Sequence, residues 1–398
     1  MNGPPVTIKR QHSCAVCGRD ELTQALDLPR LPMIGIFLDS PKEATRFPPF
    51  DQAMMICGEC GHMQLRDCLD PKYLYDERFT HRSSASASSS SGNEFFVAYL
   101  QRISGDCRIR RAVEIGCNDI HLLKLVSPIS DTVCGIDPIW RGCEPEPEGN
   151  IRVIGAFVED VDFHAELDGA PDLIISSMTF EHLTDPKKTL QRLMEVAADD
   201  ALFVIQVPGT DCLLDNCRFD QISHQHYHQF TLASFCRMIN EVGGIYLDHT
   251  VNHGYWGAIL VAFRKGGGKR ESPAFRKATP SLVAESKAHF DTQVDNCLWA
   301  IRDSGTTPIY GFGAAQCLPT LAYFMGSDLG FMRAILDDDP ARQNKYYPGI
   351  TTRIVKPEPE MQLEEAAIVV TAPDYARSLV QRISALGAEK IILPITIL

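Results

Sequence analysis

The sequence predicts an α/β protein in which a central Rossmann-like domain lies between a small cysteine-containing module and a second Rossmann-like domain. Three observations predict this class: two pairs of cysteines near the N-terminus, short apolar runs alternating with helical periods from residue 112 onward, and a second such alternation from residue 307 onward. Buried strands that alternate with helices favour a sheet with helices on both faces. We place the three parts at residues 1–78, 79–265 and 266–398.

Length and charge narrow the possible classes of protein. At roughly 150 residues per domain, the 398 residues make two to three domains. The chain has 38 Lys and Arg residues and 51 Asp and Glu residues, which gives a net charge of −13. Because the sequence also contains no long basic run, no nucleic-acid partner is expected. We expect a cytoplasmic protein without membrane contact, because neither a long apolar stretch nor the apolar core of a secretory signal is found. The sequence does not indicate an oligomeric state.

The N-terminal part contains two cysteine knuckles of identical spacing. Cys14 and Cys17 lie in CAVCG, and Cys57 and Cys60 lie in CGECG. Four thiolates at such spacing can close a tetrahedral zinc shell, and a saturated shell is structural. The 39 residues between the knuckles exceed the usual zinc ribbon, so free or redox-active thiols are the alternative.

The next segment is rich in serine. RSSASASSSSG, residues 82–92, has the composition of a flexible linker. The apolar stretch NEFFVAYLQRI follows it directly, so the alternative is a helix with its N-cap at Ser90 or Ser91.

The central part contains apolar runs typical of buried strands: RAVEIG, DTVCGID, PDLIISSM, ALFVIQVP and GAILVAFR. PKKTLQRLMEV and TLASFCRMINEVGG have apolar residues at helical spacing. The polar stretch KGGGKRESP ends this part. After it, the runs TPIYGFGAA, FMRAILDDDP, AAIVVTAP and EKIILPI predict the second α/β layer.

Two strand ends in the central part predict a binding site for S-adenosylmethionine. In VEIGCNDI a strand with an acidic residue is followed by a glycine turn and the start of a helix, and in GIDP the next strand ends at Asp137. A carboxylate at the second position can accept both ribose hydroxyls, as acidic residues do in dinucleotide folds. The candidate cofactor residues at these ends are Glu114, Gly116, Asn118, Asp119 and Asp137.

The third strand end supplies two more candidates. ISSMTFEHLTDP places Ser177 at the strand tip, where it would border the sulfonium of the cofactor. His182 either lines the site or caps a local turn.

The motifs of the chain, taken together, resemble those of a known family. CAVCG, CGECGHMQL, EIGCND, GIDP, FDQISHQHYHQFT, YGFGAA and DDDPARQNKYYPG, in this order, are similar to the sugar C-methyltransferases that modify nucleotide-linked ketosugars in antibiotic biosynthesis. The resemblance implies a zinc-binding domain, a class I methyltransferase domain and a C-terminal C-methyltransferase domain. It also implies methyl transfer from S-adenosylmethionine to a carbon beside a ketone, usually C3 of a thymidine-diphosphate 4-keto-6-deoxyhexose.

Such a reaction needs a base, and histidine is suited to this role near neutral pH. The resemblance places the family's catalytic histidine at His226 of HQHYH. His224, Gln225 and His182 are further catalytic candidates. In an extended segment His224, His226 and His228 would share one face. The alternative is a set of ordinary hydrogen-bond networks or an adventitious metal site.

The sequence departs from the family pattern in three places, which involve five residues. Ile120 stands where the family has a glycine, which would bring a branched side chain close to the cofactor. Ser223 and Gln225 stand where a Tyr and a Glu commonly flank the histidine. Pro373 and Asp374 replace a Trp-Asn step before Tyr375. These departures leave open an enzyme with another acceptor, at carbon, oxygen or nitrogen, or a catalytically silent protein that binds a nucleotide sugar or the cofactor.

The remaining candidates concern the acceptor. The family places a catalytic Tyr and serines over the mouth of the site, which makes Tyr75 and His81 of YLYDERFTHRSS candidates, with ordinary packing as the alternative. In the C-terminal part, Arg342 and Lys345 would meet the phosphates of a nucleotide diphosphate sugar. The alternative is that this layer is only a scaffold, and we expect no NAD requirement.

Overall fold

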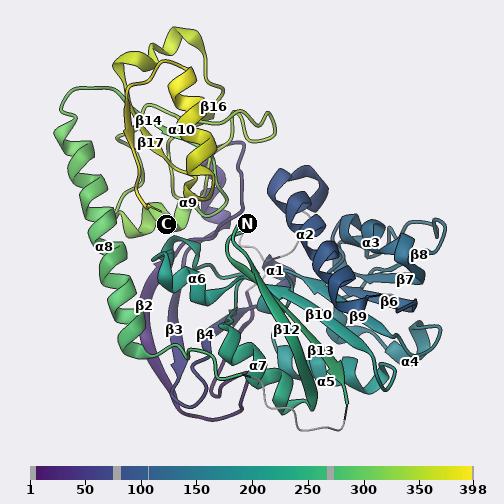
Figure 1. Ribbon diagram of the computed structural model, residues 1–398. Coiled ribbons are helices and arrows are strands. Elements are labelled where there is room, and N and C mark those ends of the chain that lie inside the picture. The colour runs from purple at the N-terminus through teal and green to yellow at the C-terminus, as the bar shows by residue number, and fades with distance from the viewer. Residues whose placement is uncertain (1–5, 75–81, 106, 267–272, 397–398) are drawn as a thin grey trace.

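The computed structural model describes residues 6–74, 82–105, 107–266 and 273–396. The chain forms an N-terminal module, a central domain and a C-terminal domain (Figure 1). Tyr75 and His81 lie outside the described residues.

The N-terminal module is built on antiparallel strands. A four-stranded sheet has the order β11-β4-β3-β2, and β1 pairs with β5 beside it. The edge strand β11 comes from the central domain, more than 150 residues further along the chain. The elements of this part are β1 (Ile8–Arg10), β2 (Leu22–Leu31), β3 (Phe50–Cys57), β4 (Met63–Leu65), β5 (Asp67–Leu69), α1 (Pro71–Leu74) and β11 (His228–Gln229).

The central domain contains a seven-stranded sheet of order β12-β13-β10-β9-β6-β7-β8. Strands β6 to β10 are parallel, and β13 inserts antiparallel between β10 and β12. The five predicted runs all form strands, and the sequence analysis missed β8 and β12. The strands are β6 (Ile109–Ile115), β7 (Ser130–Ile136), β8 (Ile151–Ile154), β9 (Leu173–Ser177), β10 (Leu202–Val207), β12 (Gly244–Asn252) and β13 (Ala258–Lys265).

Helices cover both faces of this sheet. Phe96 and Leu123, of α2 and α3, belong to one apolar cluster, whereas Leu190 and Phe235, of α5 and α7, belong to the cluster on the other face. The helices are α2 (Ala87–Ser104), α3 (His121–Val126), α4 (Phe163–Glu166), α5 (Pro186–Val196), α6 (Thr210–Asp215) and α7 (Leu232–Glu241).

The serine-rich segment is mostly helical, which corrects the linker prediction. Helix α2 begins at Ala87, and the hydroxyl of its N-cap Ser86 accepts the N–H of Ser89. Ser90 and Ser91 therefore lie inside the helix, several residues after the cap. Close packing accounts for the small residues, because a Cβ on Gly92 would lie 2.7 Å from the Tyr255 ring.

The C-terminal domain is a five-stranded parallel sheet of order β16-β15-β14-β17-β18, which confirms the predicted second Rossmann-like layer. Helix α8 runs along the left side of the molecule in Figure 1, and its Phe290 shares a core with Met54 of the N-terminal sheet. The elements are α8 (Pro280–Asp303), β14 (Ile309–Phe312), α9 (Leu318–Phe324), β15 (Ile335–Leu336), β16 (Ile354–Val355), β17 (Ala367–Val370), α10 (Ala376–Ala385) and β18 (Lys390–Ile392).

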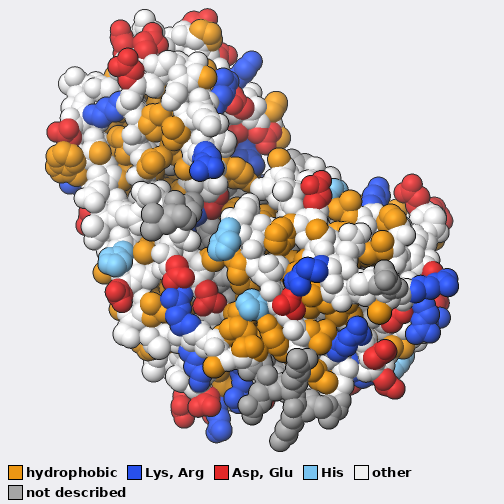
Figure 2. Space-filling model, viewed as in Figure 1, with side chains coloured by type: hydrophobic (Ala, Val, Ile, Leu, Met, Phe, Trp, Pro, Cys, Tyr) orange, Lys and Arg blue, Asp and Glu red, His pale blue; other side chains and the backbone are white. Residues whose placement is uncertain are grey.

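Two surface properties bear on function. Figure 2 shows acidic and basic side chains intermixed over the visible face, without an extended basic patch there. Within the described part of the chain, no helix has the length and apolar character needed to cross a bilayer.

Candidate functional site

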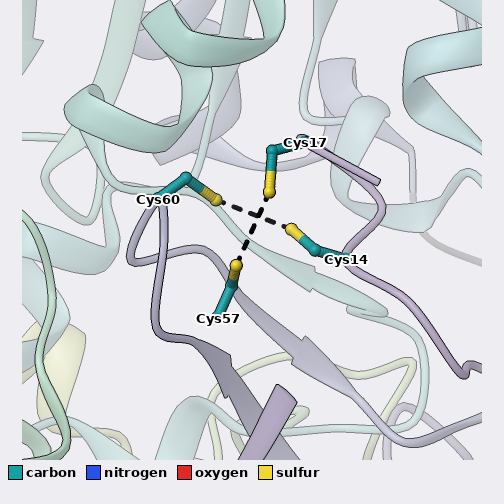
Figure 3. A group of neighbouring side chains, drawn as sticks. All are labelled: Cys14, Cys17, Cys57 and Cys60. Carbon is teal, nitrogen blue, oxygen red and sulfur yellow. Dashed lines mark hydrogen bonds between the residues drawn. The ribbon is translucent and has the colours of Figure 1, made fainter. Parts of the chain in front are cut away.

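The four predicted cysteine ligands converge on one point (Figure 3). The sulfurs of Cys14 and Cys60 are 3.5 Å apart, and those of Cys17 and Cys57 are 3.6 Å apart. Zn–S bonds of about 2.3 Å in a tetrahedron place sulfurs about 3.8 Å apart, so the four side chains fit a zinc ion. Gly61 directly follows the second knuckle with φ +72°, a left-handed turn that suits glycine.

The thiols at this point influence one another. The hydrogen bond between the sulfurs of Cys14 and Cys60 lowers the pKa of Cys14 and raises the pKa of Cys60. Four sulfurs this close repel one another as thiolates unless a cation neutralises them. Zinc at this position is structural, because it has four protein ligands and no open position.

A cavity of about 270 Å³ lies where the three parts of the chain meet. Its walls include Met33 and Phe47 of the N-terminal module and Gln316 of the C-terminal domain. No Lys or Arg occurs among the described residues that line it, whereas four carboxylic acids do: Glu114, Asp137, Glu159 and Glu181. This charge distribution favours a ligand that carries positive charge.

The strand ends predicted for the cofactor form one wall of the cavity. Gly116 follows β6 with φ +76°, and a Cβ there would lie 2.0 Å from the Thr179 hydroxyl oxygen, so the position requires glycine. Asp137 follows β7, and its carboxylate accepts the N–H groups of Asn118 at 2.8 Å and Ile139 at 2.9 Å. Burial raises the pKa of Asp137 despite these two hydrogen bonds.

Glu114 lies in the same wall and is nearly inaccessible to solvent. One of its carboxylate oxygens has no hydrogen-bond partner among the described residues. Burial, and then the neighbouring Asp137 and Asp119, raise the pKa of Glu114 well above its usual range. A buried acceptor without a donor is suited to a ligand that brings one, such as an ammonium group. The residues of this wall therefore fit S-adenosylmethionine.

The other cofactor candidates occupy different positions. Asn118 and Ser177 line the cavity, and the Ser177 hydroxyl donates to the Gln206 side-chain oxygen at 3.1 Å. Asp119 is not part of the lining. Its carboxylate accepts the backbone N–H of Ser84 at 2.9 Å and the Ser84 hydroxyl at 2.6 Å, and so holds the turn before α2.

Ile120 does not obstruct the cavity. Its backbone is left-handed, with φ +60°, an uncommon conformation for a β-branched residue. Its side chain is buried in the apolar cluster that also contains Leu122 and Leu123 of α3. Leu122 lines the cavity, whereas Ile120 does not.

The three histidines of HQHYH do not share a face, so that expectation is wrong. Residues 224 and 225 form a turn. His224 contacts the Leu31 carbonyl oxygen at 3.0 Å, and His228 contacts the Leu183 carbonyl oxygen at 3.0 Å. Of the three, only His226 is part of the lining. Burial lowers the pKa of His226 to about 3, aided by the nearby His182, so its imidazole is neutral at pH 7.

His226 lies beside two polar residues of the turn that follows β9, the 3₁₀ helix Phe180–His182. The rings of His182 and His226 have centroids 4.9 Å apart at 62°. The Nδ1 atom of His182 lies 2.8 Å from the Gln225 carbonyl oxygen, and its Nε2 atom lies 3.6 Å from a carboxylate oxygen of Glu181. His182 therefore lines the site, one of the two roles left open for it.

Sequence reasoning missed Glu181. Its carboxyl group is 1% exposed, and burial raises its pKa to about 8. The available signal was its place beside His182 in ISSMTFEHLTDP, at a strand end already assigned to the site. Tyr255 and Trp256 were missed as well. They stack with ring centroids 4.6 Å apart and add an aromatic wall to the cavity.

The cations predicted for phosphate binding make other contacts. Arg342 pairs with Asp339 at 3.2 Å and donates to the Ala314 carbonyl oxygen at 2.9 Å. Lys345 pairs with Asp39 of the N-terminal module. Neither Arg342 nor Lys345 lines the cavity. Arg342 makes contacts within the C-terminal domain, and Lys345 links that domain to the N-terminal module. Their contact with phosphate stays a prediction.

Asp374, one of the departures from the family pattern, also has a partner. The buried Arg218, at the start of the FDQI stretch, binds both Asp220 and Asp374. Gln221 donates to the same Asp374 carboxylate at 3.1 Å. The C-terminal domain is thereby tied to the segment that leads to His226.

Comparisons with known proteins cover most of the chain. Three families match successive parts of the chain. Residues 14–75 match the family described as "Putative zinc binding domain". Residues 81–243 match "Methyltransferase domain", and residues 283–395 match "C-methyltransferase C-terminal domain". C-methyltransferase NovU from Streptomyces niveus is 26% identical over 375 residues, or 87% of this chain and 86% of that protein.

Solved structures match just under half of the chain. The N-methyltransferase NodS from Bradyrhizobium japonicum WM9, in complex with S-adenosylhomocysteine, is 12% identical and covers 48% of this chain and 93% of its own, with a TM-score of 0.36. The plantazolicin methyltransferase BpumL, in complex with the same molecule, is 14% identical and covers 45% of this chain and 84% of its own, with a TM-score of 0.35.

Proposed function

The chain is an S-adenosylmethionine-dependent methyltransferase with N-terminal zinc-binding and C-terminal C-methyltransferase domains. From this premise we propose that it is a sugar C-methyltransferase, which methylates a carbon beside the ketone of a nucleotide-linked sugar. S-adenosylmethionine supplies an electrophilic methyl group when bound.

The wall formed by Glu114, Gly116 and Asp137 holds that cofactor in this proposal. Asp137 accepts the ribose hydroxyls with the lone pairs that its two backbone N–H contacts leave free. The unpartnered oxygen of Glu114 receives the ammonium group. Burial raises the pKa of the acids in the lining, and the positive charge of the sulfonium, which no Lys or Arg of the described lining opposes, would favour their ionised form.

The single observation that carries the proposal is the position of His226. It is the one imidazole of HQHYH that lines the cavity, which it shares with Glu114, Gly116 and Asp137. A carbon beside a carbonyl becomes nucleophilic when it loses a proton, and a neutral imidazole can accept that proton. In the proposed step the C–H bond of the acceptor breaks, the proton moves to His226, and the electron pair stays on the acceptor as an enolate. The cofactor held by Glu114, Gly116 and Asp137 would supply the methyl group, with S-adenosylhomocysteine as the leaving group.

The acceptor side of the cavity supports a sugar ring. The Ser223 hydroxyl and the Gln225 side-chain oxygen have no hydrogen-bond partner among the described residues, and both residues belong to the lining. Hydroxyl groups of a sugar would satisfy them. Since no Lys or Arg occurs in the described lining, the diphosphate of the proposed acceptor lies outside this cavity.

Incubation with methyl-labelled cofactor and a panel of nucleotide-linked ketosugars tests the proposal. We expect label on the carbon beside the ketone, together with exchange of that carbon's hydrogen in deuterated water. Label on oxygen or nitrogen would show that the acceptor atom is not carbon. Cofactor binding without transfer to any member of the panel would favour a silent binding protein.

A further inference from the structure

We propose that Glu181, His182 and His226 form a second metal site, separate from the four cysteines, that takes a divalent transition-metal ion such as Zn²⁺. One ligand atom from each residue lies within 4.8 Å of the other two. Two imidazoles and one carboxylate are a donor set of zinc sites that keep an open coordination position. All three residues line the cavity.

The state of Glu181 is an independent observation that points to a cation. The side chain is 1% exposed, and neither carboxylate oxygen has a hydrogen-bond partner among the described residues. A buried polar group without a partner is costly, and such groups are rare in folded proteins. A metal ion at the centre of the three side chains would satisfy this carboxylate directly.

The two imidazoles are held in place by the surrounding backbone. His182 directs Nδ1 to the Gln225 carbonyl oxygen at 2.8 Å, which leaves Nε2 on the side of Glu181. Metal-binding histidines typically donate their second nitrogen to such an oxygen, which fixes the ring for the metal. The segment around His226 is anchored on both sides, by His224 at Leu31 and by His228 at Leu183. The site therefore needs little rearrangement to bind an ion.

Metal binding has a consequence that rests on the proposed function. A metal ion and a substrate proton require the same lone pair of His226. An occupied site therefore prevents His226 from acting as a base, and excess zinc inhibits methyl transfer until a chelator removes it. The structural zinc at the four cysteines has no open position and is not involved in this inhibition.

Metal analysis of the full chain tests the site without reference to activity. Protein equilibrated with Zn²⁺ and freed of unbound metal is expected to hold two zinc ions per chain. Glu181→Gln keeps the size of the side chain but weakens the second site about a hundredfold, by analogy with losses seen when ligand shells are altered. Glu159→Gln, the same change at another acid of the lining, is the matched control and keeps both ions. One zinc in the wild type would overturn the proposal.

Co²⁺ added to protein that keeps the cysteine-bound zinc, after a chelator has emptied the second site, gives a second readout. We expect visible bands of a cobalt ion bound to nitrogen and oxygen, without thiolate charge-transfer bands, and no such signal in Glu181→Gln. Charge-transfer bands would show that cobalt merely replaces zinc at the cysteines, which contradicts the second site. Activation of methyl transfer by the added ion would leave the site standing but exclude His226 as the proposed base, so the two proposals fail separately.

Discussion

His228 of the central domain lies directly opposite Gln64 of the N-terminal module as an antiparallel strand partner. Gln64 follows the second cysteine knuckle by four residues, and His228 follows His226 by two. The backbone N–H of Leu65 also donates to the Tyr227 carbonyl oxygen at 2.8 Å. The zinc-bound module thus supplies the strand that holds the segment of the candidate base.

Loss of the structural zinc is therefore expected to reduce catalysis as well as stability. Cys57→Ser removes one ligand, and because zinc binding contributes folding free energy to such modules, the module should unfold and release its partner strand. We expect loss of the cysteine-bound zinc, a lower melting temperature and a large fall in kcat. Cys143→Ser, at an exposed cysteine of the central domain, is the control for the substitution itself. Full activity in a zinc-free Cys57→Ser protein would contradict this coupling.

Replacement of the candidate base separates catalysis from cofactor binding. His226→Asn is expected to lower kcat by about 10²- to 10⁴-fold, the usual range for a general base. Affinity for S-adenosylmethionine, measured by calorimetry, should change by about twofold or less, because His226 does not belong to the wall of Glu114, Gly116 and Asp137. His253→Asn, the same substitution at an exposed histidine, is the control. Retained hydrogen exchange at the acceptor carbon in His226→Asn would exclude the role.

Cofactor affinity should depend on pH through Asp137. Its pKa is raised by burial, and the charged groups facing it are Glu114 and Arg82. The ionised carboxylate accepts ribose hydroxyls, whereas protonation removes one of these acceptors. Affinity for S-adenosylmethionine should therefore be full above the raised pKa of Asp137 and decline as the pH falls through it. Calorimetry between pH 5 and 8 measures this effect, and Asp137→Asn should bind more weakly with a flatter profile. An unchanged affinity in that variant would exclude the ribose contact.

Replacement of Ile120 should change the stability of the protein but not its affinity for the cofactor. Ile120→Ala removes a buried side chain and should lower the free energy of unfolding by about 2–4 kcal/mol. The affinity for S-adenosylmethionine should stay the same, because this side chain is outside the cavity lining. Denaturant unfolding and calorimetry on the same preparation measure both quantities. Tighter cofactor binding by the Ala variant would mean that Ile120 does obstruct the cofactor.

Local sequence patterns were sufficient for the two α/β layers, the cluster of four cysteines and the strand ends that form one wall of the cavity. Apolar runs mark buried strands, knuckle spacing marks a tetrahedral site, and the carboxyl ends of neighbouring parallel strands meet at one edge of a sheet. Each of these features depends on residues close together in the sequence. The serine-rich segment shows the limit of composition, because α2 begins there through the cap at Ser86 and packing against Tyr255.

The assignment of the three histidines could not be made from their spacing. Which of the three histidines lines the cavity depends on residues that lie far away along the chain. His224 contacts the backbone of Leu31, and His228 contacts the backbone of Leu183 and pairs with Gln64. Glu181 is a candidate ligand for the same reason, since its lack of a partner is a property of its buried surroundings. Hydrogen-bond competition among distant segments, which no local pattern records, selects the side chains that line the cavity.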